Sequence, residues 1–327
     1  MTQSPEVTVL ICTWNRAALL DETLGSLARM KVPQEVRWDV VVVDNNSTDG
    51  TRRLIETRAA AFPVPLTYLF EHRQGKSSAM NAGLRASPAP IVAFADDDVR
   101  VDHGWLATAV EAFRIRPDIS YVGGPVDPIW EAPCPPWFER SGKTLWGTLA
   151  ILDYGRVPFV FEDRQRVPLG ANFAVRRTLV DRIGDFDPAL GRNSETVLLG
   201  QELPEFFARA RDAGARGMYL PSMRVQHHVP ARRLQPEYFR RWWYGKGISR
   251  ARMEAAHPVT ELGLDMRRVP TIAGIPRFLF GSAARDAMRW VRAVFRGDAG
   301  DRFAAETQLW YFYGQLTERL RRPRPTV

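Results

Sequence analysis

The chain has 327 residues, of which 45% are hydrophobic and 25% are charged, and this balance excludes a disordered or fibrous protein. No stretch reaches the roughly 18 to 20 uncharged apolar residues that a membrane-spanning helix needs, and the N-terminus lacks the pattern of a secretion signal. The two cysteines, Cys12 and Cys134, imply neither a disulfide framework nor a zinc site. We therefore expect a protein of the reducing cytosol.

The net charge of +8 is concentrated near the C-terminus. Residues 240–327 carry 17 basic and 8 acidic side chains, whereas the preceding part of the chain carries 28 and 29. This asymmetry predicts contact with an anionic surface, either nucleic acid or a layer of phospholipid headgroups. Solvated, arginine-rich helices would produce the same bias and are the alternative interpretation.

The first 125 residues alternate between strand-like and helix-like patterns. Continuous apolar runs predict buried strands at residues 7–12, 38–43, 66–70, 91–95 and 119–122. Apolar residues at helical spacing predict helices at residues 17–30 and 76–86, and others that begin near residues 48 and 104. This alternation is typical of an α/β protein with a mostly parallel sheet covered on both faces. Ligands bind such sheets beyond the carboxyl ends of the strands.

The regular alternation breaks at residues 127–168, where prolines and tryptophans predict a partly irregular insertion over the sheet. Residues 201–213 predict a helix, and residues 218–225 predict a short strand that leads to His227 and His228. Beyond Pro236 the pattern predicts helices rich in arginine and aromatic residues.

One of these C-terminal helices has two contrasting faces. Its apolar face consists of Phe280, Ala284, Ala287, Val291 and Val294, and its basic face of Arg285, Arg289, Arg292 and Arg296. A basic amphipathic helix of this kind can lie in a membrane interface. A helix packed on the domain with a solvated arginine stripe is an equally good interpretation.

Three consecutive acids, Asp96, Asp97 and Asp98, end the predicted strand at residues 91–95. Their mutual repulsion costs stability unless a cation compensates it, and hard cations such as Mg2+ or Mn2+ prefer carboxylate oxygens together with phosphate. Capping of the following helix is the structural alternative, but one acid suffices for a cap. Asp44 also ends a strand. Because neighbouring side chains can supply the local cap, we expect Asp44 to be available to a ligand.

The motifs together resemble the family-two glycosyltransferases of the GT-A fold over residues 7–244. The resemblance rests on five segments in order: VTVLICTWNR, VVVDNNSTDGT, RQGKSSAMNAG, IVAFADDD, and LGANFAV followed by IGDFD. It implies a mostly parallel twisted sheet with helices on both faces, followed by a helical, basic C-terminal extension. It also implies an inverting transfer of sugar from a nucleotide diphosphate sugar.

The resemblance implies a role for individual residues. Thr13, Asn15 and Arg16 would line the nucleotide pocket, and Asp44 would take the base edge. Further donor contacts would come from Arg73, Lys76, Asn81, Asp96 and Asp97. Asp96 and Asp98 match the Asp-x-Asp motif that holds Mn2+ or Mg2+, and His227 matches a position that can complete the metal or diphosphate site.

The catalytic base is the point at which the sequence departs from the family. The usual pattern is Gly-Glu-Asp-x-Glu with the Asp as base, whereas this chain has Leu203 at the Asp position. Either Glu202 or Glu205 serves as the base, with Glu202 favoured, or catalysis is lost. Glu195 is a more distant alternative.

We therefore predict a GT-A domain at residues 1–235, with a nucleotide-binding half at 1–100 and an acceptor half at 101–235. A helical extension at residues 236–327 would contact the inner membrane face, so the protein would be cytoplasmic and peripheral on the membrane. The predicted function is metal-dependent sugar transfer to a glycan or lipid-linked acceptor in cell-surface polysaccharide or glycolipid synthesis. A catalytically degenerate binder of nucleotide sugar that partners another transferase is the alternative. No nucleic acid is expected as a partner, because the chain carries no recognised nucleic-acid motif.

Overall fold

The computed structural model describes residues 4–162, 166–191, 200–256, 265–272 and 274–321. Within these ranges, no helix combines the length and apolar character needed to cross a bilayer. The chain forms two compact units, one from residues 1–129, 150–194 and 202–228 and the other from residues 130–149, 195–201 and 229–327. The second unit takes in residues 130–149, which the sequence analysis assigned to the catalytic domain. The functional boundary at residue 235 stays a prediction.

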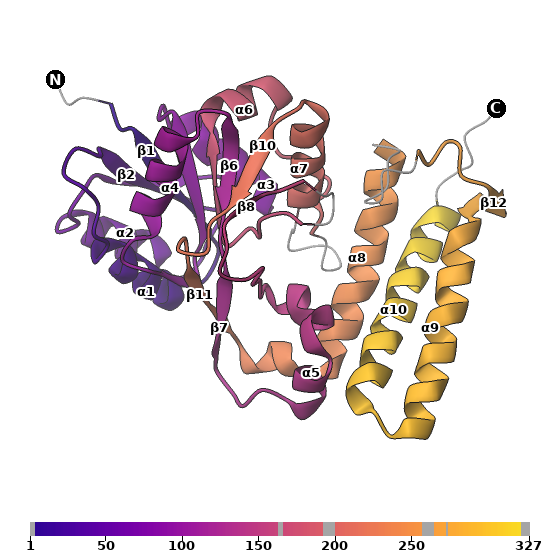
Figure 1. The fold of residues 1–327 in the computed structure, drawn as a ribbon. Helices are drawn as coiled ribbons and strands as arrows, with labels where there is room; N and C mark the ends of the chain where they lie inside the picture. Colours follow the sequence, from indigo (N-terminus) through magenta and orange to yellow (C-terminus); the bar gives the residue numbers. More distant parts are fainter. Residues whose placement is uncertain (1–3, 163–165, 192–199, 257–264, 273, 322–327) are drawn as a thin grey trace. The chain divides into compact units, whose positions relative to one another are not determined.

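The first unit is built on an eight-stranded sheet with the order β3-β2-β1-β4-β9-β6-β10-β8 (Figure 1). Neighbouring strands in the β3-β2-β1-β4 half are parallel, and β9 runs antiparallel between β4 and β6. The strands are β1 Val7–Thr13, β2 Trp38–Asp44, β3 Leu66–Phe70, β4 Ile91–Asp96, β6 Ile119–Gly123, β8 Phe159–Val160, β9 Asn172–Arg176 and β10 Arg216–Tyr219.

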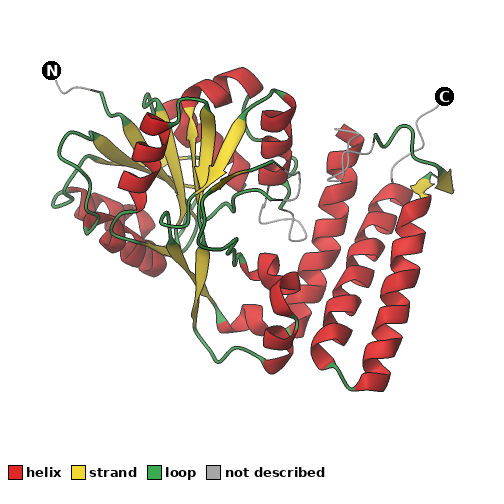
Figure 2. Cartoon of the chain, in the orientation of Figure 1, coloured by secondary structure: helices red, strands yellow, loops and turns green. Residues whose placement is uncertain are grey.

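Helices follow most of these strands and cover the sheet (Figure 2). They are α1 Ala17–Ala28, α2 Thr51–Ala59, α3 Lys76–Ala86, α4 Trp105–Ile115, α6 Arg177–Ile183 and α7 Glu202–Asp212. Strand β2 demonstrates that both faces of the sheet are buried. Val40 and Val42 belong to the large core, whereas Val41 and Val43 pack with Ala79 of α3 in a separate cluster. Because successive side chains of a strand point to opposite faces, the apolar run of β2 needs cover on both sides.

A three-stranded sheet, β5-β11-β7, completes the first unit, with β5 at Val99–Val101, β11 at Val225–Val229 and β7 at Val126–Trp130. Strand β5 separates the acidic residues 96–98 from helix α4, so those acids do not cap that helix. The single strand predicted at residues 218–225 is wrong. Strands β10 and β11 belong to different sheets, because a turn at Pro221, which has no N–H to donate to a ladder, redirects the chain.

The second unit is dominated by three long helices, α8 Pro236–Ala256, α9 Arg277–Arg296 and α10 Ala299–Arg321. It also contains the short helix α5 Pro136–Arg140, which contacts α10. Within this unit α10 packs against both α8 and α9 (Figure 1). The crossing of α8 and α10 is close, since a Cβ added to Gly247 would lie 2.1 Å from the carbonyl oxygen of Tyr311. The predicted helical C-terminal extension is thus confirmed for the described residues.

Candidate active site

The carboxyl ends of three parallel strands bring the polar segments of the sequence together. Strand β1 lies between β2 and β4, and its register pairs Thr13 with Asp44 and Cys12 with Asp96. Polar residues that are separated by some 30 to 50 positions in the chain therefore share one edge of the sheet. This edge is where ligands bind in open α/β sheets.

The three acids after β4 have cationic partners within the chain itself. The guanidinium of Arg16 donates to Asp97 (3.0 Å) and to Asp98 (2.8 Å), and Nζ of Lys76 lies 2.6 Å from Asp96. The hydroxyl of Thr13 donates to the second oxygen of Asp97 (2.8 Å). Arg16 and Lys76 thus offset part of the repulsion among the three acids, and a metal ion at this edge stays a prediction.

Burial shapes the protonation chemistry of this edge. Burial and the neighbouring carboxylate of Asp98 raise the pKa of Asp97 to about 6, against the opposing charge of Arg16. Burial disfavours the charged form of Arg16, yet the carboxylates of Asp97 and Asp98 outweigh it and raise the pKa of the guanidinium. Burial also raises the pKa of Cys12, so its thiol stays protonated and is no nucleophile at neutral pH.

His227 reaches the acidic edge through the small sheet. Pairing of β11 with β5 sets His227 opposite Val99, and its Nε2 lies 3.4 Å from Oδ1 of Asp98. The backbone N–H of the next residue, His228, donates to the carbonyl of Asp98 (2.9 Å). His227 is 2% exposed, and its buried Nδ1 has no hydrogen-bond partner among the residues that the structure describes. A histidine and a carboxylate, two ligand types that Mn2+ accepts, thus lie side by side.

The described residues include no group of three or more His, Cys, Asp or Glu side chains that could hold a metal ion by itself. This arrangement still fits a magnesium-type ion, which is commonly bound by one or two carboxylates together with substrate phosphates and water. Asp98 and His227 could be two adjacent ligands of such a shared site, and Asp96 stands nearby at the end of β4.

Asp44 and Asn15 shape the loops at the end of β1 and β2. Asp44 is 2% exposed and accepts hydrogen bonds from the backbone N–H of Ser47 (2.9 Å) and the hydroxyl of Tyr68 (3.0 Å). The expectation that neighbouring residues spare Asp44 this local role is therefore wrong, and a ligand would have to use its remaining lone pairs. Asn15 has a positive φ of 52° and accepts from the N–H of Thr48 (2.7 Å), which ties the two loops together.

Sequence reasoning missed Asn45, which organises the loop that carries Arg73. Its amide nitrogen donates to the carbonyls of Glu71 (3.0 Å) and Arg73 (2.8 Å), and its oxygen accepts from the N–H of Gly75 (2.7 Å). Gly75 has φ 137°, a conformation that favours glycine. The only available signal was the position of Asn45 directly after a strand-ending aspartate.

Arg73 itself is held by Glu71. Its guanidinium donates to both carboxylate oxygens of Glu71 at 3.1 and 3.0 Å, and the Arg73 backbone N–H donates as well. These hydrogen bonds lower the pKa of Glu71 to about 2. More than half of the Arg73 side chain is nevertheless exposed, so this cation stands at the rim and is accessible to an anionic ligand.

Asn81 is not brought into the acidic group. Its amide nitrogen donates to the carbonyl of Phe186 (2.8 Å), and its oxygen accepts from the N–H of the same residue (3.0 Å). Both ends of the amide therefore fasten α3 to the segment after α6, which is a structural task. A nucleotide contact by Asn81 remains a prediction that this geometry does not favour.

The two candidate bases lie in different surroundings in the first turn of α7. Glu205 is 1% exposed and forms a two-point ion pair with Arg209, with Oε1 to Nε at 2.5 Å and Oε2 to Nη2 at 2.9 Å. The guanidinium of Arg209 also donates to carbonyls at residues 183–185, so the pair anchors α7 to the end of α6. Glu202 is the first residue of the helix and is 6% exposed. Glu195 lies outside the described residues.

Leu203 borders the acidic edge. A Cβ placed on Gly170 would lie 2.8 Å from Cδ1 of Leu203 and 3.3 Å from Nζ of Lys76, the cation that holds Asp96. The start of α7 therefore approaches the same edge of the sheet as the acids. The apolar side chain of Leu203 therefore lies near Lys76, at the position where family-two glycosyltransferases usually have the catalytic Asp.

Comparison with known proteins agrees with this geometry. The model of the family "Glycosyl transferase family 2" matches residues 8–184. The chain is 30% identical to the succinoglycan biosynthesis protein ExoM of Rhizobium meliloti over 290 residues, which cover 87% of this chain and 88% of that protein. It is 26% identical to a glucosyl-dolichyl phosphate glucuronosyltransferase of Haloferax volcanii, with 77% and 79% of the two chains covered.

Solved structures share the fold at lower identity. A mannosyltransferase of Pyrobaculum calidifontis, in complex with GDP-mannose and Mn2+, superimposes with a TM-score of 0.62 at 20% identity over 97% of this chain and 88% of that one. The transferase GalNAc-T7, with UDP, GalNAc and Mn2+, gives a TM-score of 0.52 at 16% identity over 79% and 51%. The expected α/β architecture with a mostly parallel sheet is confirmed.

Proposed function

The chain belongs to glycosyl transferase family 2 and is a glycosyltransferase, and we propose that it moves a sugar from a nucleotide diphosphate sugar to an acceptor hydroxyl with inversion at the anomeric carbon. One observation carries the donor assignment. Acidic and basic side chains gather beyond the carboxyl ends of β1 and β4, where Arg16 pairs with Asp97 and Asp98, and Lys76 of α3 pairs with Asp96. Arg16 and Lys76 can turn from their carboxylates to a diphosphate, and the carboxylates can then take a cation.

Asp98 and His227, with Asp96 beside them, would hold Mn2+ or Mg2+ together with the donor phosphates. Relatives of the same fold were solved with Mn2+ and a nucleotide or nucleotide sugar, which supports this choice. When bound, the ion would neutralise negative charge on the diphosphate. The nucleotide side of the pocket would be lined by Thr13, Asn15 and Arg16, with Asp97. The buried Asp44 would take the base edge, and the exposed Arg73 would stand at the rim.

The transfer itself needs a base and a stabilised leaving group. The acceptor oxygen would form a bond to the anomeric carbon while the bond from that carbon to the diphosphate oxygen breaks. Glu202 would accept the hydroxyl proton as general base. Lys76 and Arg16 would stabilise the charge that grows on the departing nucleoside diphosphate. Glu205 is the poorer candidate, because Arg209 occupies both of its oxygens.

The acceptor is proposed from the named relatives. ExoM is a succinoglycan biosynthesis protein, and the Haloferax volcanii enzyme is named for a glucosyl-dolichyl phosphate. A glycan or lipid-linked acceptor, in synthesis of a cell-surface polysaccharide or glycolipid, is consistent with both names.

Leu203 favours a second candidate, a catalytically degenerate chain that binds nucleotide sugar as the partner of another transferase. An apolar residue at the usual base position removes the ordinary proton acceptor. Under this alternative the wild-type chain binds donor without turnover, and Leu203→Asp, which sets a carboxylate next to Lys76, creates activity.

The test is a panel of UDP-, GDP- and dTDP-sugars with Mn2+ or Mg2+, scored by release of the nucleotide. The variants are Asp98→Asn, Glu202→Gln and Leu203→Asp, with Glu111→Gln as a matched control that removes an exposed helical carboxylate. We expect release with one donor class, loss in the first two variants and an unchanged rate in the control. Metal-dependent donor binding without release by the wild type, together with gain of release in Leu203→Asp, would establish the degenerate candidate instead.

A further inference from the structure

Helix α9 exposes two chemically different faces, which we name by their residues. The apolar sector consists of Phe280, Ala284, Ala287, Val291, Val294 and Phe295. The arginine sector consists of Arg285, Arg289, Arg292 and Arg296. All ten residues are exposed, and the largest side chain at the C-terminal end, Phe295, is 85% exposed.

Little of α9 is used to hold the second unit together. Leu279 and Ala293 are its two buried residues, and they mark the edge that packs along α10. The ring of Phe280 also touches that of Phe312 on α10, with centroids 5.7 Å apart. Among the described residues, no element covers the rest of the apolar sector, although Val291 and Val294 remain 45% and 42% exposed. An uncovered apolar face of this size marks an interaction surface.

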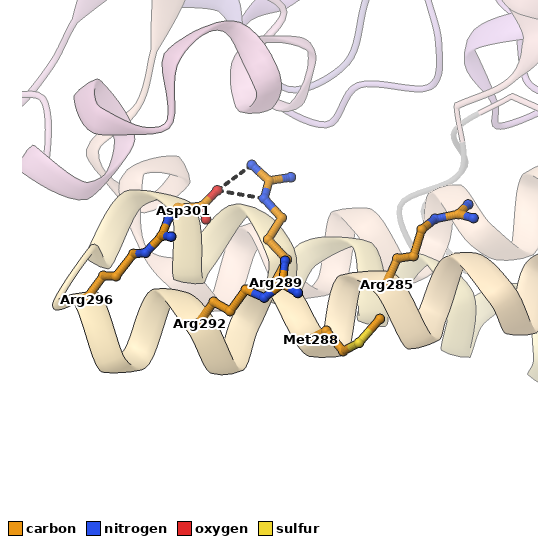
Figure 3. A pocket seen from close by; sticks show the side chains of 6 residues that line it. All are labelled: Arg285, Met288, Arg289, Arg292, Arg296 and Asp301. Carbon is orange, nitrogen blue, oxygen red and sulfur yellow. Dashed lines mark hydrogen bonds and ion pairs between the residues drawn. The ribbon is translucent and has the colours of Figure 1, made fainter.

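The arginine sector borders a surface hollow of about 290 Å3, lined by its four arginines together with Met288 and Asp301 (Figure 3). Asp301 pairs with Arg289, whose Nε lies 2.6 Å from its carboxylate. Arg292 and Arg296 form no ion pair within the part of the chain that the structure describes. The sector therefore keeps a surplus of positive charge.

We propose that α9 docks on the surface of an anionic phospholipid bilayer, with the apolar sector entering the interface and the arginine sector contacting headgroup phosphates. The combination of an exposed aromatic and aliphatic face with a basic opposite face is that of helices which lie in the plane of a membrane. Charge complementarity selects the occupant. The surplus arginines attract anionic lipid headgroups, whereas a contact with a second copy through the apolar sectors would leave both arginine sectors without an anionic partner.

Membrane docking by α9 extends the proposed function, and only its biological purpose rests on that function. A lipid-linked acceptor lies at a bilayer surface, and docking through α9 keeps the enzyme at that surface between turnovers. Binding itself requires neither donor nor catalysis, so it can be measured separately from transfer.

The experiment is co-sedimentation of the full chain, without nucleotide sugar, with vesicles of phosphatidylglycerol and phosphatidylcholine or of phosphatidylcholine alone. One variant, Arg292→Gln/Arg296→Gln, weakens the arginine sector, and another, Val291→Ser/Phe295→Ser, weakens the apolar sector. The matched controls are Arg53→Gln/Arg182→Gln, which removes the same charge from exposed sites on α2 and α6, and Ile115→Ser/Val157→Ser, which alters exposed apolar residues elsewhere. Thermal unfolding verifies that each variant is folded.

Binding to the anionic vesicles, with little binding to neutral ones and weakening at high salt, is the expected result. Each basic side chain near an anionic surface contributes about fivefold, so the arginine variant should bind roughly 30-fold more weakly. The affinity of the apolar variant should fall about tenfold or more, because the bilayer interface no longer receives Phe295, the most exposed ring of α9. Both controls should bind within about twofold of the wild type.

Three outcomes would overturn the proposal. If the wild type does not bind the vesicles, or if the α9 variants bind as well as the controls, α9 does not contact the membrane. Loss in the arginine variant alone would show that the apolar sector does not enter the interface and that only electrostatic contact remains. If the wild type does not bind vesicles, and light scattering finds it dimeric and the apolar variant monomeric, the apolar sector contacts a second copy of the chain. None of these results alters donor turnover, so the transferase proposal stands or falls separately.

Discussion

Replacing Glu202 and Glu205 of α7 one at a time tests which glutamate is catalytic and which is structural. We expect Glu202→Gln to lower kcat by about 10^2 to 10^4-fold, the usual contribution of a general base. Its melting temperature should change little, because the replacement keeps the shape of the side chain. Glu205→Gln should instead destabilise the fold, because it leaves Arg209 without its charge partner.

The magnitude for Glu205→Gln follows from the burial of the pair. The side chains of Glu205 and Arg209 are 2% and 21% exposed. Removal of one partner of a buried pair costs about 3 to 5 kcal/mol, and the lower value applies because Arg209 keeps its carbonyl partners and some water. For a unit of this size the loss corresponds to a melting temperature lower by roughly 6 to 12 °C.

Circular dichroism melting and nucleotide release, measured on the same preparations, provide the assay. Below its melting temperature, Glu205→Gln should retain turnover within about tenfold of the wild type, while Glu202→Gln should not. A folded Glu205→Gln protein that melts with the wild type yet has lost turnover would refute the assignment. Glu205 would then be the base, and its ion pair with Arg209 would contribute little to the stability of the fold.

Three further outcomes test the architecture around the site. Asn172→Ala should lower the free energy of unfolding by about 3 to 5 kcal/mol in chemical denaturation, because it strands the indole N–H of Trp105 and two buried carbonyls. Glu71→Gln should be less stable than the wild type above pH 4.5, because the hydrogen bonds from Arg73 stabilise the ionised form of Glu71 and lower its pKa. The difference in stability should vanish as the pH falls towards about 2, where Glu71 becomes protonated. Gly83→Ala should lower the melting temperature, since its Cβ would meet a β1 side chain at 2.2 Å, whereas Gly25→Ala should not.

The fold of the first half could be predicted because its signals are local. Continuous apolar runs located β1, β2, β4 and β6, since strands buried on both faces need apolar residues at most positions, and a similar run located the partly buried edge strand β3. Strands β5, β7 and β8 were missed because they are short and lack such runs. The antiparallel strand β9 was missed because nothing local in residues 172–176 indicates that they insert between β4 and β6.

Local sequence patterns were sufficient to predict a sheet whose strands end in Thr13, Asp44 and Asp96, and to identify the family. The partner of each of these side chains became visible only in the folded chain. Arg16 pairs with two of the acids, Asn81 hydrogen-bonds to the backbone of Phe186, and Glu205 pairs with Arg209. Periodicity reports which face of an element is buried, whereas the identity of a charge partner depends on loops and helices that approach from distant parts of the chain.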